Sequence, residues 1–414
     1  RCSSQMNALF SILRGDSAVC QLADVLGGEP QQIFAHGFSG SMKHAAVAAA
    51  YDGNPRPLAI VTSGRESLRA WQEDLSALLP EADVYELPEL DHVNFAVPGA
   101  AKGLERSAQR MNILARFLRH EPIIVLADIG AAAQKGLSTT EFSRAALSLR
   151  LGQDLPREIL MERLSALGYE HVPEVENVGQ FSVRGGIVDV FPINALSPIR
   201  VEFSDTEIDS MREYDPLTKR SIKNIGTASI MPLRAADDNG EACFLSYLGA
   251  AGTSVFDEPS RLMAALEDGV REDAVRAAGC FSWAEMTAAG TEGHEVFISL
   301  MNRAVPTCTP QTLIGVQMVP MTAFQRQFSL LESELHRYLG EGMRVLILAG
   351  GAEQAARMRE MLTLWKLPTV ISRGADAPAE HAVTISPGTL RAGFELSASR
   401  TAVLTEQDIF GRHK

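Results

Sequence analysis

The chain has 414 residues, of which 46% are hydrophobic and 21% charged, and its formal net charge is −13. A chain of this length and ordinary globular composition is expected to fold into roughly two to four domains. No apolar run approaches the ~20 residues of a membrane helix and no secretory signal is visible, so we expect a cytoplasmic protein with no membrane partner.

The five cysteines and nine histidines are scattered along the chain, without a Cys-x-x-Cys or His-Glu-x-x-His pattern. This spacing argues against a disulfide framework or a zinc site and fits a reducing compartment. We therefore predict no metal site. The first residue is Arg1 rather than Met and the chain stops abruptly at Lys414, so we expect a segment of a longer polypeptide.

Strand and helix patterns alternate over residues 30–152, a rhythm that predicts a parallel sheet with helices on both faces. The expected strands are 32–36, 57–62, 83–87 and 123–127, and the expected helices are 41–51, 65–79 and 104–120. We assign residues 1–152 to this first α/β domain.

A Gly-rich segment at residues 37–44 follows the first strand and opens the first helix, which is the position of a phosphate-binding loop. Gly37, Gly40 and Lys43 fit such a loop, but Met42 occupies the place of a glycine and His44 that of the hydroxyl that binds magnesium. A bulky side chain crowds the backbone curl and a neutral imidazole is a poor magnesium ligand. The motif therefore indicates a degenerate loop, and we expect no magnesium or other cofactor; residual binding of a nucleotide or another anion at the remaining helix N-terminus is the alternative that stays open.

Residues 153–232 begin with a helix at 156–167 and continue almost entirely as strands and turns, so we assign them to an inserted α+β domain. The segment 179–192 reads as strand, tight Gly-Gly turn and strand. In residues 199–204 apolar side chains alternate with Arg200, Glu202 and Ser204, which are expected to face outward. The region has 8 Lys/Arg against 13 Asp/Glu, so a protein partner fits it better than DNA does.

The remainder of the chain returns to α/β patterns. Residues 233–305 are expected to be a smaller α/β piece that completes the first module, and residues 306–414 a further α/β domain. Residues 306–320 contain three prolines and no charge, which suits a linker, and a helix is expected at 323–339.

Several blocks within residues 184–221 resemble the insertion domain shared by the bacterial excinuclease B subunit and the transcription-repair coupling factor (Mfd). The blocks are Arg-Gly-Gly-Ile-Val-Asp-Val-Phe-Pro from 184, Arg-Val-Glu-Phe from 200, Glu-Ile-Asp-Ser-Met-Arg from 207 and Tyr-Asp-Pro-Leu-Thr-Lys-Arg-Ser from 214. In both families this domain docks onto the excinuclease A subunit. The resemblance implies that Arg184 and Arg200 contact that partner.

One residue departs from the family pattern, because Ser204 stands where the family has a phenylalanine. An aromatic anchor that is lost from an interface can remove a few kcal/mol of affinity. The contact is therefore expected to be weaker, or to be shifted to a neighbour such as Phe181. The residues alone also allow a simpler interpretation, in which Arg184 and Arg200 satisfy local carbonyls or Asp189.

Three further features separate the two families and favour the coupling factor. The excinuclease B subunit has an intact phosphate loop and a long aromatic hairpin, whereas residues 88–106 are short and have Phe95 as their one aromatic residue. Residues 386–411 resemble the end of the third domain of the coupling factor.

The resemblance implies a non-catalytic N-terminal region that recruits the excinuclease A subunit where RNA polymerase has stalled, in nucleotide excision repair. Contacts with RNA polymerase and DNA, and the ATP- and magnesium-dependent translocase, are expected in domains outside this chain. Two alternatives remain: an active ATP-binding repair helicase subunit of the excinuclease B type, and a general α/β interaction module.

Overall fold

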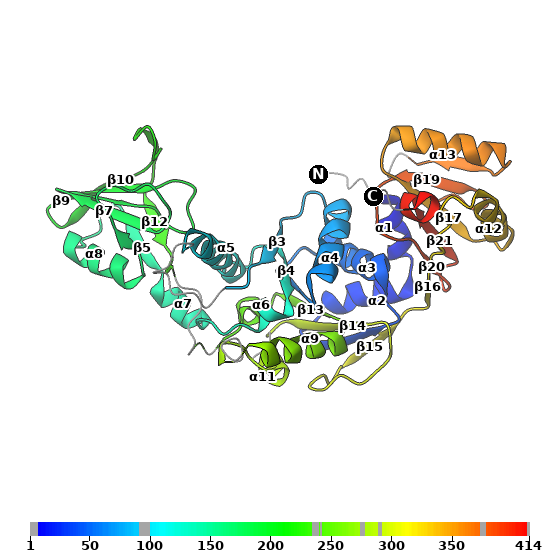
Figure 1. Ribbon diagram of the computed structural model, residues 1–414, viewed down its shortest axis with the longest axis horizontal. Coiled ribbons are helices and arrows are strands. Elements are labelled where there is room, and N and C mark those ends of the chain that lie inside the picture. Colours follow the sequence, from blue (N-terminus) through cyan, green and yellow to red (C-terminus); the bar gives the residue numbers. More distant parts are fainter. Residues whose placement is uncertain are drawn as a thin grey trace.

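The computed structural model describes residues 7–90, 100–233, 240, 242–273, 278–288, 292–372 and 378–411. Phe95 and the centre of the short segment 88–106 lie outside these residues. The described strands form a seven-stranded, two six-stranded and a two-stranded sheet. In Figure 1 the seven-stranded sheet occupies the middle of an elongated molecule, with the two six-stranded sheets at opposite ends.

The central sheet is parallel throughout and confirms the α/β fold expected from residues 30–152. Its strands, in spatial order, are β15 (Thr312–Gly315), β1 (Gln32–His36), β14 (His294–Ser299), β13 (Thr253–Asp257), β2 (Leu58–Thr62), β4 (Ile124–Asp128) and β3 (Val84–Leu87). Segments on both sides of residues 153–232 therefore contribute to one sheet.

Successive side chains of a strand point to opposite faces of the sheet, so each face forms an apolar cluster with the helices that cover it. Ile33 and Ala35 pack into one apolar cluster, whereas Phe34 packs into the other. The first cluster contains α1 (Asn7–Arg14), α2 (Ser17–Leu26), α3 (Gly40–Gly53) and α4 (Arg65–Leu78). The second contains α5 (Ala100–Leu118), α6 (Ile129–Ala133), α9 (Pro259–Glu272), α11 (Trp283–Ala288) and the 3₁₀ turn η1 (Phe244–Tyr247).

The inserted region folds around a curved six-stranded sheet at the left of Figure 1. Its strands in spatial order are β11 (Ser221–Asn224), β10 (Glu207–Tyr214), β9 (Ile199–Ser204), β8 (Ile187–Val190), β7 (Gln180–Arg184) and β6 (Glu170–His171). All pairs are antiparallel except β6 with β7. α8 (Arg157–Ala166) buries Leu160 and Leu164 in the same core. A small antiparallel sheet of β5 (Leu147–Arg150) and β12 (Thr227–Ile230) adjoins it.

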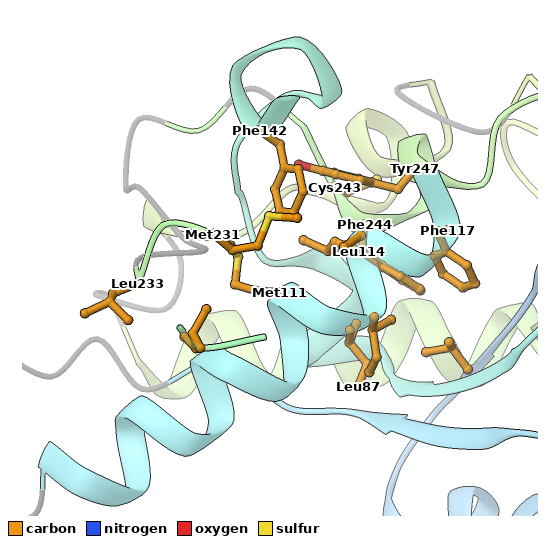
Figure 2. Packing of buried hydrophobic residues seen from close by; sticks show 14 of the residues in the cluster. Leu87, Met111, Leu114, Phe117, Phe142, Met231, Leu233, Cys243, Phe244 and Tyr247 are labelled. Carbon is orange, nitrogen blue, oxygen red and sulfur yellow. The ribbon is translucent and has the colours of Figure 1, made fainter. Parts of the chain in front are cut away.

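α5 joins the inserted region to the central sheet by an apolar junction, shown in Figure 2. Its side chains meet residues from α7 (Thr139–Ala145), from the chain that returns after β12 and from η1; the labelled members are Leu87, Met111, Leu114, Phe117, Phe142, Met231, Leu233, Cys243, Phe244 and Tyr247. Two hydrogen bonds fasten this junction, because Ser107 Oγ donates to Leu233 O at 2.6 Å and Tyr247 Oη donates to Leu137 O at 2.7 Å.

The third large sheet is mixed and lies at the right of Figure 1. Its strands in spatial order are β16 (Met318–Pro320), β20 (Phe394–Leu396), β21 (Thr401–Thr405), β17 (Arg344–Ala349), β19 (Val383–Pro387) and β18 (Thr369–Ile371). The helices α12 (Phe328–Gly340), α13 (Ala352–Leu364) and α14 (Glu406–Phe410) pack around it.

Two expectations for residues 306–339 need correction. The stretch 306–320 is not a plain linker, because β15 pairs in parallel with β1 in the central sheet and β16 joins the third sheet. The following helix begins at Phe328 rather than near 323, because Gln325 and Arg326 have φ of 49° and 68°, which no right-handed helix accommodates. The limits proposed between the four regions stay predictions.

Candidate partner-binding surface

The tight turn between β7 and β8 forms as the Gly-Gly sequence predicts. Gly185 adopts a φ of +58°, which glycine reaches without the penalty that a Cβ brings. A Cβ on Gly186 would lie 3.2 Å from Phe203 O, so the turn also packs closely against β9. The turn therefore brings Arg184, at the end of β7, beside the neighbouring strands.

The alternation in β9 also forms as predicted. Ile199 and Val201 are buried in the core and Phe203 is partly buried, whereas Ser204 is exposed. On the opposite face the register places Asp189 of β8, Arg200 of β9 and Arg212 of β10 in one row across the sheet. We call this surface the arginine face; its members are Glu174, Arg184, Asp189, Arg200, Glu202, Arg212 and Lys219.

Arg200 is held in place by Asp189 and Tyr214. Its Nε and Nη2 donate to the two Asp189 carboxylate oxygens at 2.7 and 2.8 Å, and its guanidinium lies 4.8 Å from the centre of the Tyr214 ring. The Asp189 side chain is 3% exposed and that of Arg200 is 19% exposed. The bond to Asp189 raises the pKa of Arg200. The simpler interpretation of Arg200 as a satisfied strand arginine thus describes its bond to Asp189, and 19% of its side chain remains exposed.

Arg184 is much freer, with a side chain that is 56% exposed. Its Nη2 lies 3.9 Å from Glu174 Oε1, and the same carboxylate accepts a closer contact of 3.0 Å from Lys219 Nζ. The hydrogen bond from Lys219 is the main reason that the pKa of Glu174 lies below its usual value. An exposed and weakly paired guanidinium is available for a two-pronged contact with a carboxylate of a partner.

Ser204 and Phe181 have opposite environments. Ser204 is exposed at the end of β9, where it pairs with Glu207. Phe181 is 1% exposed and its ring stacks on His171 at 4.9 Å, so it lies inside the core and not on the arginine face. Its burial argues against a role as a substitute contact.

The sequence analysis named Glu202 as outward-facing but missed its partners Ser210 and Arg212, and also missed Lys219 and Glu174. Glu202 accepts hydrogen bonds from Ser210 at 2.7 Å and from Arg212 at 2.5 Å, and these bonds help to lower its pKa. Four ion pairs lie on this face: Arg200 with Asp189, Arg212 with Glu202, and both Arg184 and Lys219 with Glu174. The signal that would have found them is the pairing of β9 with β8 and β10, which the alternation within β9 alone does not give.

The degenerate phosphate loop is packed against the chain just after β14 and β15. Gly37 and Gly40 have φ of 81° and 52°, values typical of a curled glycine loop. However, the Gly37 N–H donates to Leu300 O at 3.1 Å, and a Cβ on Gly37 would lie 2.2 Å from Val316 O. Backbone from the segment around β15 therefore occupies the space next to this glycine.

Lys43 has a structural partner. Its Nζ lies 2.6 Å from Asp257 Oδ1, and the side chains are 12% and 2% exposed. Asp257 Oδ2 also accepts hydrogen bonds from Ser67 Oγ at 2.9 Å and Trp71 Nε1 at 2.8 Å. The charge that a phosphate would need is thus neutralised by a buried carboxylate at the end of β13.

His44 belongs to a second buried pair beside the loop. Its Nδ1 lies 2.6 Å from Asp74 Oδ2, and its ring packs 4.2 Å from that of Trp71. Burial lowers the pKa of His44, which favours a neutral ring whose Nδ1–H donates to Asp74. Asp74 Oδ1, on α4, accepts the N–H of Arg391, and Ser41 Oγ accepts that of Ala392, so α4 and the loop both bond to the segment between β19 and β20 of the third sheet.

In the part of the chain that the structure describes, no cluster of three or more His, Cys, Asp or Glu side chains could hold a metal ion. Within the same residues, no helix is both long and apolar enough to span a membrane.

Residues 147–235 match the family model of the UvrB interaction domain. Over 92% of its length the chain is 24% identical to the transcription-repair-coupling factor of Bacillus subtilis, and over 98% it is 22% identical to that of Staphylococcus aureus (strain bovine RF122). It spans 38% and 40% of these two relatives. Among solved structures, a hypothetical ATP-dependent RNA helicase from Sulfolobus tokodaii aligns over 92% of this chain and 77% of its own, with 11% identity and a TM-score of 0.25. The chain is thus similar, over nearly its whole length, to the N-terminal region of transcription-repair-coupling factors, with a UvrB interaction domain at residues 147–235.

Proposed function

We propose that this chain is the non-catalytic recruiting region of a transcription-repair coupling factor, and that its arginine face binds the excinuclease A subunit. The observation that carries the proposal is the placement of Arg184 and Arg200 on one face of the domain that matches the UvrB interaction domain. Arg184 is exposed and weakly paired, so it is available to a partner, whereas Arg200 is oriented by Asp189 before a partner binds.

The complete protein would act at RNA polymerase stalled by DNA damage, in the cytoplasm. Its ATP-driven translocation, its contact with RNA polymerase and its hold on DNA would reside in parts of the coupling factor beyond the matched region. This chain would supply the link to excision repair without a cofactor of its own.

The alternative, an active nucleotide-binding repair helicase subunit, would need a free lysine at the phosphate loop. Lys43 instead makes a buried ion pair with Asp257, and backbone packs against Gly37. Both observations favour the recruiting function over nucleotide hydrolysis.

The proposal can be tested with Arg184→Ala, because removal of an exposed side chain leaves the fold intact. Arg357→Ala is the matched control, since Arg357 is 73% exposed on α13 of the third sheet. Surface plasmon resonance with the excinuclease A subunit of the same organism measures the binding kinetics. Arg184→Ala should weaken binding about tenfold or more, mainly through faster dissociation. Equal binding by wild type and both variants would refute the role of the arginine face.

A further inference from the structure

Leu217 is one of the exposed large apolar side chains of the inserted region, with Leu151, Leu196 and Ile222. Its side chain is 91% exposed, although most large apolar side chains of this domain are buried. It lies in the turn between β10 and β11, three residues after Tyr214 and two before Lys219. The residue contributes nothing to the core in this position.

The turn that carries Leu217 is rigid. Asp215 Oδ1 accepts the N–H groups of Leu217 at 2.9 Å and Thr218 at 2.7 Å, and these backbone bonds lower the pKa of Asp215. The Asp215 carbonyl accepts the N–H of Lys219 at 2.8 Å, and its own N–H donates to Arg220 O at 2.9 Å. An apolar side chain on such a turn loses little backbone freedom when a partner covers it.

The turn is also tied to both arginines of the proposed interface. On one side of Leu217, the Tyr214 ring lies beneath the guanidinium of Arg200. On the other side, Lys219 binds Glu174, the carboxylate next to Arg184. Leu217 therefore borders the arginine face, and a partner that covers one is positioned to cover the other.

We propose that Leu217 is an apolar anchor for the excinuclease A subunit, entering an apolar pocket whose rim carries the carboxylates that meet Arg184 and Arg200. The inference rests on the proposed function and names a specificity-determining contact within it. An apolar side chain that is buried beside charged contacts is a common arrangement in protein interfaces. This anchor would compensate for Ser204, which offers no aromatic side chain at the other end of β9.

The test is the binding of Leu217→Ala to the excinuclease A subunit. Because the side chain is exposed, the melting temperature should not change, whereas the dissociation constant should rise about tenfold or more. Leu364→Ala is the matched control, since Leu364 is 81% exposed on α13 in the third sheet, and it should bind like the wild type. Asp215→Ala keeps the leucine but frees the turn, and should weaken binding several-fold.

The outcomes separate the two levels of the proposal. If wild type binds, Arg184→Ala weakens binding and Leu217→Ala does not, the anchor is refuted while the recruiting function stands. If wild type does not bind at all, the recruiting function fails and the anchor falls with it. A loss with Leu217→Ala that equals the loss with Leu364→Ala would also refute the anchor, because the effect would not depend on the position.

Discussion

At the scale of single residues, most charges of the arginine face are closely paired, and Arg184 is the weakly paired exception. Asp189 forms an ion pair with Arg200, and Glu202 forms one with Arg212. The pairing fixes side chains before a partner arrives, which reduces the entropy lost on binding. The pairing also makes a single substitution of Arg200 hard to interpret, because it lowers the stability of the domain as well as removing an interface contact.

A double-mutant cycle on Asp189 and Arg200 should reveal this coupling. Arg200→Ala leaves a carboxylate that is 3% exposed without its ionic partner, so we expect a loss of about 2 kcal/mol in the free energy of unfolding. In Asp189→Ala/Arg200→Ala the loss should be smaller than the sum of the two single losses. Urea unfolding measures both quantities, and additive losses would contradict the pairing.

At the scale of elements, the lysine that would bind a phosphate at the start of α3 instead forms an ion pair with Asp257 at the end of β13. The buried contact between Lys43 and Asp257 links the start of a helix to the end of a strand that lies 214 residues further along the chain. Both carboxylate oxygens of Asp257 accept hydrogen bonds, from Lys43, Ser67 and Trp71. The element that resembles a nucleotide site thus stabilises the central sheet.

Lys43→Ala should therefore reduce stability and not a nucleotide affinity. We expect a loss of about 3 kcal/mol in the free energy of unfolding, because a buried Asp257 loses its counter-charge. The wild-type chain titrated with ATP and magnesium should give no heat. Heat with the wild type that disappears in Lys43→Ala would show that the loop still binds nucleotide.

The elements that could be predicted are those with a strong local pattern. Buried strands such as Ile124–Asp128 and the alternation around Val201 are visible in the sequence, since each depends on neighbouring residues. β15 was missed because a short strand between prolines has no such pattern. The start of α12 was misplaced because the left-handed residues Gln325 and Arg326 are set by tertiary contacts, including bonds from their N–H groups to Asp408 and Ile409.

The candidate site was predicted unevenly for a similar reason. Arg184 and Arg200 were found through resemblance to a family, and Asp189 through a weighed alternative. Lys43 with Asp257, and Asp74 with Arg391, join residues far apart in sequence, and a single sequence carries no signal for such contacts. Leu217 was noted only within a block that resembles the family, because exposure is a property of the fold.

At the scale of the whole molecule, the third sheet is fastened to the central one through the degenerate loop. Leu390 and Phe394 share an apolar cluster with α3 and α4, and Asp74 binds both His44 and the backbone of Arg391. The protonation of His44 therefore bears on how the two parts hold together.

Stability should fall as pH drops below about 6.5. Burial lowers the pKa of His44 and of His294 below the ordinary value of 6.5, so the unfolded chain binds more protons in this range. The free energy of unfolding consequently decreases with acidification. Melting temperatures between pH 7.5 and 5.5 should show the decline, and His44→Gln should reduce its slope. A flat profile for the wild type would contradict the buried neutral histidine.

The measurement that tests the central claim most directly is a calorimetric titration of the 414-residue chain with the excinuclease A subunit of its own organism, at low and moderate salt. The account predicts a dissociation constant of about 1 μM or lower, weakened by salt because charges steer and hold the partner. The charge reversal Arg184→Glu should abolish the heat. No heat from the wild type, or undiminished binding by Arg184→Glu, would contradict the claim that the arginine face recruits this partner.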